Sequence, residues 1–74
     1  MIDAARIEAL LRKLSIPHES PRANDIRGMI DEAVKYVETT HHELKPSDLS
    51  LRAKREADDA AWITIEPAHV SFYV

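Results

Sequence analysis

The 74-residue sequence contains no cysteine, one glycine and one tryptophan. Without cysteine the chain has no disulfide, no thiolate ligand for zinc and no cysteine nucleophile. Small secreted domains usually depend on disulfides, so this absence favours a reducing compartment, and we predict a cytoplasmic protein. A single glycine also counts against a turn-rich all-β fold.

Long apolar runs are missing too, and no stretch approaches the ~18 residues that a membrane-spanning helix requires. Residues 1–6 lack the basic-then-apolar order of a signal peptide. The sequence has no G-x-S-x-G, no glycine-rich phosphate-binding motif and no H-E-x-x-H. We therefore predict a protein that is not an enzyme, that needs no cofactor and that does not associate with a membrane.

The sequence also lacks an excess of positive charge: its net charge is −3 when the histidines are neutral. Nonspecific nucleic-acid binding relies on an excess of lysine and arginine, so the overall charge counts against it. The length predicts one domain over residues 1–74, which buries only about 60% of the surface that its unfolded chain exposes. Such a small domain often gains stability from a partner, and we expect a homodimer or an obligate complex as readily as a monomer.

Helical spacing of apolar residues is what the first half of the chain does contain. One helix is predicted over about 4–15, with Asp3 as its N-cap. Its apolar face is Ile7, Leu10, Leu11 and Leu14. A second helix over about 21–40 starts with Ser20 as N-cap and Pro21 at its first position. Its apolar stripe is Ile26, Ile30, Ala33, Val34 and Val37.

A third helix is predicted over about 48–62, with Ser47 or Asp48 as its N-cap. Its small-residue face is Leu49, Ala53, Ala57, Ala60 and Ala61. Gly28 lies inside the second helix, where glycine costs about 1 kcal/mol relative to alanine. We interpret this glycine as a point of close approach by another helix.

The C-terminal residues change to the strand period of two. Apolar residues at 70, 72 and 74 alternate with Ser71 and Tyr73, and residues 62–65 are rich in aromatic and β-branched types. Either these two segments form a hairpin, or the third helix extends through Ile65 and an extended strand follows. The predicted fold class is mainly α, a three-helix domain with a short C-terminal β-hairpin or extended strand, and a small α+β fold is the variant. The predicted core is Ile7, Leu10, Leu11, Leu14, Ile26, Ile30, Val34, Val37, Leu49, Ala53, Ala57, Ala60, Ile63 and Phe72.

The only dense basic run consists of Arg52, Lys54 and Arg55. It suggests a nucleic-acid-binding regulator, which is the alternative function. Asp58 and Asp59 follow at once and would repel phosphates, and no glycine-rich loop or series of stacking aromatics accompanies the run. On a helix this basic-to-acidic order opposes the helix dipole. Either the helix boundaries differ, or the side chains pair along the helix (Arg55 with Asp58 and Asp59, Lys54 with Asp58), or this face meets a charged partner.

Aromatic residues gather near the C-terminus, where Trp62 and Tyr73 belong to the types enriched in interface hot spots. In the competing interpretation Trp62 and Phe72 close the helical core. The favoured function is a small acidic, non-enzymatic protein-binding module that acts as an inhibitor or adaptor by docking on a larger protein. Its predicted partner-binding residues are Trp62, Tyr73, Arg52, Lys54, Arg55, Asp58 and Asp59.

Histidines raise the question of a metal. His41, His42 and Glu43 are adjacent, and neighbouring side chains on a helix point about 100° apart. Glu38 and His42 have the i,i+4 spacing of helical ligands, but they supply only two ligands where a tight site needs three or four. The prediction is that the protein has no metal site.

Overall fold

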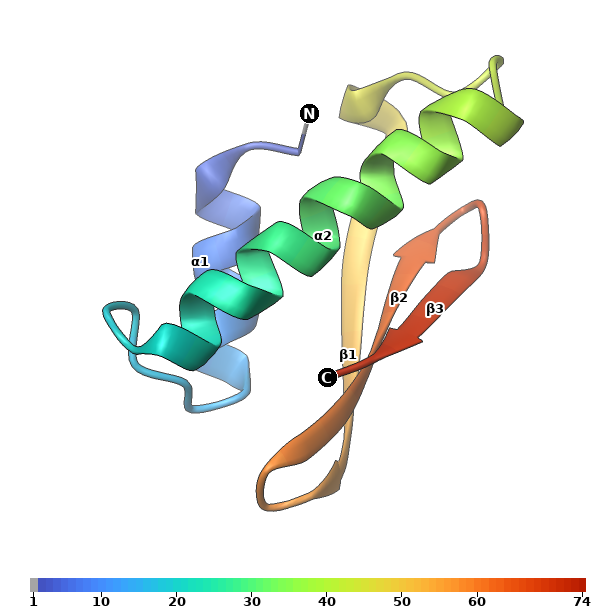
Figure 1. The fold of residues 1–74 in the computed structure, drawn as a ribbon. Helices are drawn as coiled ribbons and strands as arrows, with labels where there is room; N and C mark the ends of the chain where they lie inside the picture. Colours follow the sequence, from blue (N-terminus) through green and yellow to red (C-terminus); the bar gives the residue numbers. More distant parts are fainter. Residues whose placement is uncertain (1) are drawn as a thin grey trace.

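The computed structural model describes residues 2–74, which form two helices followed by a three-stranded antiparallel sheet (Figure 1). The elements are α1 (Ala4–Lys13), α2 (Pro21–Thr40), the 3-10 turn η1 (Pro46–Asp48), β1 (Ser50–Ala57), β2 (Ala60–Glu66) and β3 (Val70–Tyr73). This is an α+β fold with two helices, and the predicted mainly-α, three-helix domain is wrong.

The error lies in the segment predicted as a third helix over 48–62, which forms β1 and the start of β2. The two strands pair with Leu51 opposite Ile65 and Ala53 opposite Ile63. Alanine is small and favours helices, so the alanines of this segment indicated a helix. For this reason the alternation of inward-facing and outward-facing residues along the strand was not recognised. The non-local pairing with β2 overrides that local preference, as is common for strands.

The C-terminal segment forms a β-hairpin, in which Ile63 lies opposite Phe72 and Ile65 opposite Val70. The rival arrangement, a helix continuing through Ile65, is wrong because Ile65 is a strand residue. The strand order β1-β2-β3 makes β2 the central strand.

Both helices start at capping residues that accept a backbone hydrogen bond. Asp3 Oδ1 accepts from the Arg6 N–H at 2.9 Å, and Ser20 Oγ accepts from the Ala23 N–H at 3.2 Å. Pro21 occupies the first turn of α2. Backbone N–H groups of a first turn have no intrahelical acceptor, so proline, which lacks an N–H, breaks no helix hydrogen bond there. Local chemistry therefore determines where both helices begin.

The core lies between the helices and one face of the sheet. Its buried residues are Ile2, Ile7, Leu10, Leu11, Leu14, Ala23, Ile26, Ile30, Val34, Val37, Leu49, Ala61, Ile63 and Ile65. Ala53, Ala60 and Phe72 were predicted in the core and are half-buried, whereas Ala57 is exposed beside the β1–β2 turn. The predicted core omitted Ile65 and Ala61, which are buried because they share the strand parity of Ile63.

The opposite face of the sheet is uncovered. Trp62 and Tyr73, which alternate with inward-facing residues, expose 41% and 51% of their surfaces. Figure 1 shows α1 and α2 on the other side of the sheet, and α1 packs on β1. No helix among the described residues is long and apolar enough to cross a membrane.

Gly28 was interpreted as a point of close helix packing, and this is wrong. A Cβ built at Gly28 meets no other atom within 4 Å, because the residue lies on the solvent side of α2. Replacing Gly28 with alanine should therefore stabilise the protein by about 1 kcal/mol, since glycine loses more backbone entropy on helix formation. Chemical denaturation followed by circular dichroism measures this gain. An unchanged or lower free energy of unfolding would contradict the exposed, regular helix at this position.

Candidate functional site

The uncovered face of the sheet brings together residues that are distant in the sequence. We call this surface the outer face, and it comprises Arg52, Lys54, Trp62, Thr64, Glu66, Ser71 and Tyr73. Strand register arranges it in rows, in which Lys54 lies opposite Trp62 and Trp62 lies opposite Tyr73. Four of the predicted partner-binding residues, Arg52, Lys54, Trp62 and Tyr73, therefore share one surface.

Trp62 and Tyr73 contact each other across strands β2 and β3. Their ring centroids lie 5.1 Å apart with an interplanar angle of 66°, an edge-to-face arrangement. Each ring supports the other, so the pair presents a pre-formed aromatic surface. The interpretation in which Trp62 closes the core does not fit, since Trp62 is one of the large exposed apolar residues.

The two cations of the outer face keep most of their surface in water. Arg52 lies 3.9 Å from the Glu66 carboxylate, and 76% of its side chain is exposed. An exposed pair of this length stabilises the fold little, and Arg52 can exchange Glu66 for a partner's carboxylate. Beside it, the hydroxyls of Thr64 and Ser71 hydrogen-bond each other at 2.8 Å. The outer face thus joins an aromatic pair to exposed positive charge and a polar border.

Arg55 is directed away from the outer face. It lies opposite Ala61, a buried residue of the inner face. Its guanidinium donates from Nη2 to the Leu14 carbonyl at 2.7 Å and from Nη1 to the Asp58 carbonyl at 3.0 Å. Arg55 therefore ties the sheet to the C-terminal end of α1. Asp59 lies exposed in the β1–β2 turn, beyond the last strand pair, Ala57 and Ala60.

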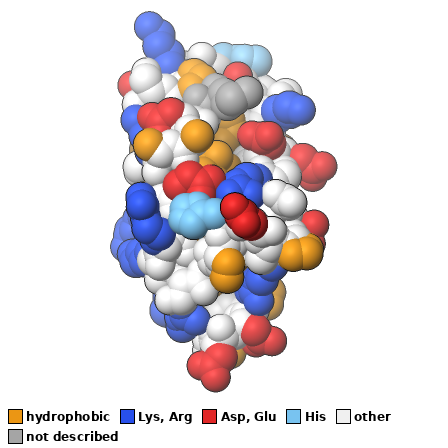
Figure 2. All heavy atoms as spheres, turned by 90° about the vertical axis from the view of Figure 1, so that its left-hand side faces the viewer, with side chains coloured by type: hydrophobic (Ala, Val, Ile, Leu, Met, Phe, Trp, Pro, Cys, Tyr) orange, Lys and Arg blue, Asp and Glu red, His pale blue; other side chains and the backbone are white. Residues whose placement is uncertain are grey.

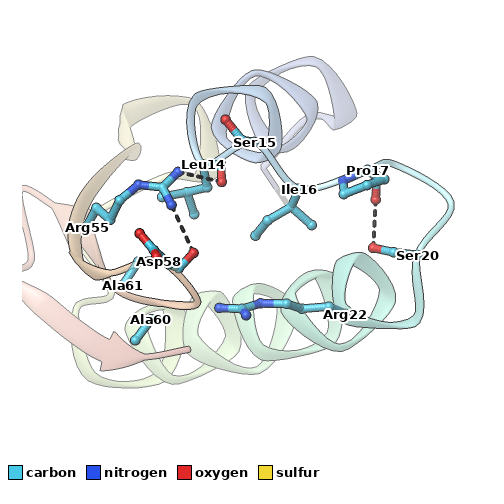
Figure 3. A pocket seen from close by; sticks show the side chains of 10 residues that line it. All are labelled: Leu14, Ser15, Ile16, Pro17, Ser20, Arg22, Arg55, Asp58, Ala60 and Ala61. Atoms are coloured by element: carbon cyan, nitrogen blue, oxygen red, sulfur yellow. Dashed lines mark hydrogen bonds between the residues drawn. The ribbon is translucent and has the colours of Figure 1, made fainter.

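An open cavity of about 330 Å³ lies between this turn and the loop that joins the helices (Figure 3). Its walls are mainly apolar, with Leu14 and Ile16 on one side and Ala60 and Ala61 on the other. Asp58 is the only carboxylate among the lining residues, so the cavity offers no pair of carboxylates for acid–base catalysis. Arg22 also lines the cavity and extends from α2 toward Ala60 (Figure 3).

A second group of charged residues links α1, the interhelical loop and α2. Arg27 donates to Glu8 Oε1 from Nη2 at 2.9 Å and from Nε at 3.2 Å, and His18 Nδ1 contacts Glu8 Oε2. Figure 2 shows the α1 side of the molecule, on which basic, acidic and histidine side chains are interspersed. The hydrogen bond from Arg27, with that from His18, lowers the pKa of the Glu8 carboxyl below its usual 4.5.

This lowered pKa predicts a pH dependence of stability. A carboxyl whose folded pKa is depressed contributes stability above its unfolded pKa and loses it as the pH falls through the folded value. Glu8→Gln should therefore lower the melting temperature at pH 7, and the difference from wild type should shrink below about pH 4.5. Melting curves from pH 7 to pH 3 measure it. Glu19→Gln is the control, because Glu19 forms no ion pair within residues 2–74. A gap that stays constant with pH would contradict the role of the Glu8 charge.

The histidines near residue 41 do not form a helical ligand pair. α2 ends at Thr40, so Glu38 and His42 do not share a helix face. His41 Nδ1 lies 3.3 Å from Glu43 Oε1. The hydrogen bond from the Glu43 backbone N–H lowers the pKa of the Glu43 carboxyl, and the contact with His41 lowers it further. Within the described residues no three His, Asp or Glu side chains are grouped to hold a metal ion.

Some residues of the surface were not identified from the sequence. Thr64, Glu66 and Ser71 belong to the outer face because they alternate with the inward-facing Ile63, Ile65 and Phe72. The period of two in residues 70–74 predicted that alternate residues of this segment face opposite sides. The interpretation of residues 48–62 as a helix gave no such alternation for the neighbouring segment. Met29 and Tyr36 lie on α2 with 43% and 58% of their surfaces exposed, and they were not predicted as binding residues either.

Comparison with known proteins yields no relative: no family model, no curated protein and no solved structure matches this chain.

Proposed function

We propose that the protein is a non-enzymatic protein-binding module that acts as an inhibitor or adaptor by docking its outer face on a larger protein. The observation that carries the proposal is the row of Lys54, Trp62 and Tyr73 across an uncovered sheet face. Tryptophan, tyrosine and arginine are the residue types most enriched in interface hot spots. The cysteine-free composition supports a cytoplasmic location for this activity.

The mechanism is occlusion by a rigid surface. The edge-to-face contact holds both rings in place, so little side-chain entropy is lost when a partner covers them. Arg52 and Lys54 lie beside the rings and favour a partner with acidic residues around an apolar pocket. These exposed charges contribute mainly to the association rate and to specificity, while the aromatic pair supplies most of the affinity.

Affinity capture from host lysate with the wild type and with Trp62→Ala and Tyr73→Ala tests the proposal. We expect each substitution to weaken a captured partner's binding at least ~10-fold, as for hot-spot aromatics. Tyr36→Ala is the matched control, because Tyr36 is at least as exposed as Trp62 and Tyr73 but lies on α2. Circular dichroism confirms that each variant is folded. Retention of every wild-type partner by Trp62→Ala and Tyr73→Ala would refute the proposal.

Single-stranded nucleic acid is a second candidate ligand, and one specific observation favours it. The structure places the aromatic pair beside Arg52 and Lys54, which supplies the combination of stacking rings and cations that the linear sequence lacks. The net charge of −3 and the nearby Glu66 carboxylate oppose phosphate binding. Protein binding therefore remains the first proposal.

Trp62 fluorescence separates these candidates, because Trp62 is the only tryptophan. If single-stranded oligonucleotides bind at the outer face, stacking should quench the emission, and the apparent affinity should fall steeply with salt. Emission that does not change at low salt would exclude this second function. Arg55→Ala is not a suitable variant for the test, since Arg55 supports the fold and lies off the outer face.

A further inference from the structure

β3 is the border strand of the sheet on the side away from α1, which packs on β1 (Figure 1). Its hydrogen-bonding groups alternate in direction. Ala61 and Val74 exchange backbone hydrogen bonds of 3.2 and 2.9 Å. In an antiparallel ladder every second residue then bonds to the same neighbour, so the backbone groups of Phe72 also face β2.

The backbone N–H and C=O groups of Ser71 and Tyr73 therefore point to the free edge. They form no backbone hydrogen bond with a turn or loop within residues 2–74, and β2 is the only strand beside β3 in the described sheet. An unpaired row of this kind is a template for another strand. Natural proteins usually protect such an edge with lysine, proline or a bulge.

β3 has none of these protections. Residues 70–74 include no charged residue and no proline, and the β2–β3 register is regular. By contrast, the other border strand, β1, carries Arg52, Lys54 and Arg55 and has an irregularity between Arg55 and Ala57. The charge-free edge is the one that a second strand can approach without electrostatic repulsion.

A hollow of about 320 Å³ runs beside this edge, between α2 and β3. Met29 and Ala33 line it from the helix, and Phe72 and Tyr73 line it from the strand. Glu32 is its only charged residue and is exposed, so its carboxylate can stay in water when the hollow is covered. Apolar side chains of an added strand would find contacts here as well as the backbone bonds.

We infer that two copies of this chain pair antiparallel through β3, with the two-fold axis at Phe72. In this register Ser71 lies opposite Tyr73 of the second copy, and by symmetry Tyr73 lies opposite Ser71 of the second copy. All outward backbone groups of Ser71 and Tyr73 then form hydrogen bonds, four between the two copies. The edge is thus self-complementary in hydrogen bonding, and residues 70–74 carry no charged side chain that would repel a second copy. Together these features favour a second copy over an unrelated strand.

Such a dimer has a continuous six-stranded sheet, and the outer faces of the two copies join across the axis. The inference does not depend on the proposed function, because it concerns the edge of the sheet and not its face. A short strand contact lies at the small end of protein interfaces, below about 1,200 Å², so we expect a dissociation constant in the micromolar range.

Sedimentation equilibrium of the full chain, from about 10 μM to about 1 mM, tests the association. We expect a monomer–dimer equilibrium for the wild type and a monomer throughout for Ser71→Pro. Proline at this position removes an N–H that faces the free edge and leaves the bonds to β2 intact. A wild-type chain that stays monomeric over the whole range would overturn the inference. This outcome covers the case in which the edge of β3 pairs with a strand of another protein and not with a second copy.

The register is tested separately by cysteine cross-linking, since the natural chain has no cysteine. Opposite residues at a non-hydrogen-bonded pair lie about 4.5 Å apart, within reach of a disulfide. Phe72→Cys should therefore oxidise to a covalent dimer. Ser71→Cys is the matched control and should cross-link at least ~10-fold more slowly, because its counterpart lies beyond about 7 Å. Equal rates for the two variants would overturn pairing about Phe72.

Discussion

Ile63→Ala is expected to remove about half of the protein's stability. Ile63 is fully buried in the central strand, between Ala53 on β1 and Phe72 on β3. Truncating a buried isoleucine to alanine costs about 2–5 kcal/mol, because a cavity remains when the neighbours cannot collapse into it. A domain of this size has about 4–11 kcal/mol in total, at roughly 0.05–0.15 kcal/mol per residue.

Urea denaturation followed by circular dichroism measures this loss, and Thr64→Ala is the control. Thr64 is adjacent to Ile63 but faces outward, where its hydroxyl bonds only Ser71. Its replacement should cost under about 1 kcal/mol, the usual value for a surface hydrogen bond. Equal losses in the two variants would contradict the alternation of inner and outer faces along β2.

Arg55→Ala should be the second most damaging substitution, with a loss of about 2 kcal/mol, as for hydrogen bonds that involve a charged donor. Leu14 is the C-cap of α1, where carbonyls lack intrahelical partners, and Arg55 donates to the Leu14 carbonyl at 2.7 Å. Without the guanidinium this part-buried carbonyl and the β1–β2 turn lose their common donor.

Arg52→Ala is the matched control for that measurement. Arg52 lies three residues away on the same strand, but it faces outward with only a distant contact to Glu66. Exposed pairs of this kind contribute about 0–1 kcal/mol, so the free energy of unfolding should barely change. Chemical denaturation of both variants gives the comparison. Similar losses for the two arginines would refute the separate role of Arg55.

These two arginines show what a linear pattern cannot distinguish. In the sequence, Arg52, Lys54 and Arg55 form one basic run, and a helical interpretation spreads them around a helix. In the strand, Arg52 and Lys54 share the outer face, whereas Arg55 turns inward to α1. The division depends on strand parity, which becomes visible only once β1 is paired with β2.

The same division determines which predicted site residues belong together. Trp62 and Tyr73 are eleven positions apart in the sequence and touch because β2 and β3 pair in a particular register. Asp58 and Asp59 follow soon after the basic run in the sequence, yet they lie in the β1–β2 turn, outside the strand pairs that carry the aromatic residues. A surface made of cross-strand neighbours cannot be derived from spacing along one segment.

The sequence by itself determined the features that arise within a few residues: the caps at Asp3 and Ser20, the helical stripes that follow them and the alternation in 70–74. These depend on hydrogen bonds and side-chain spacing inside one segment. Only the tertiary structure decided that 50–57 is a strand, that the aromatic pair joins Arg52 and Lys54, and that β3 has a free edge. Those outcomes depend on pairing between separate strands, whose burial and backbone hydrogen bonds outweigh the helix preference of the alanines.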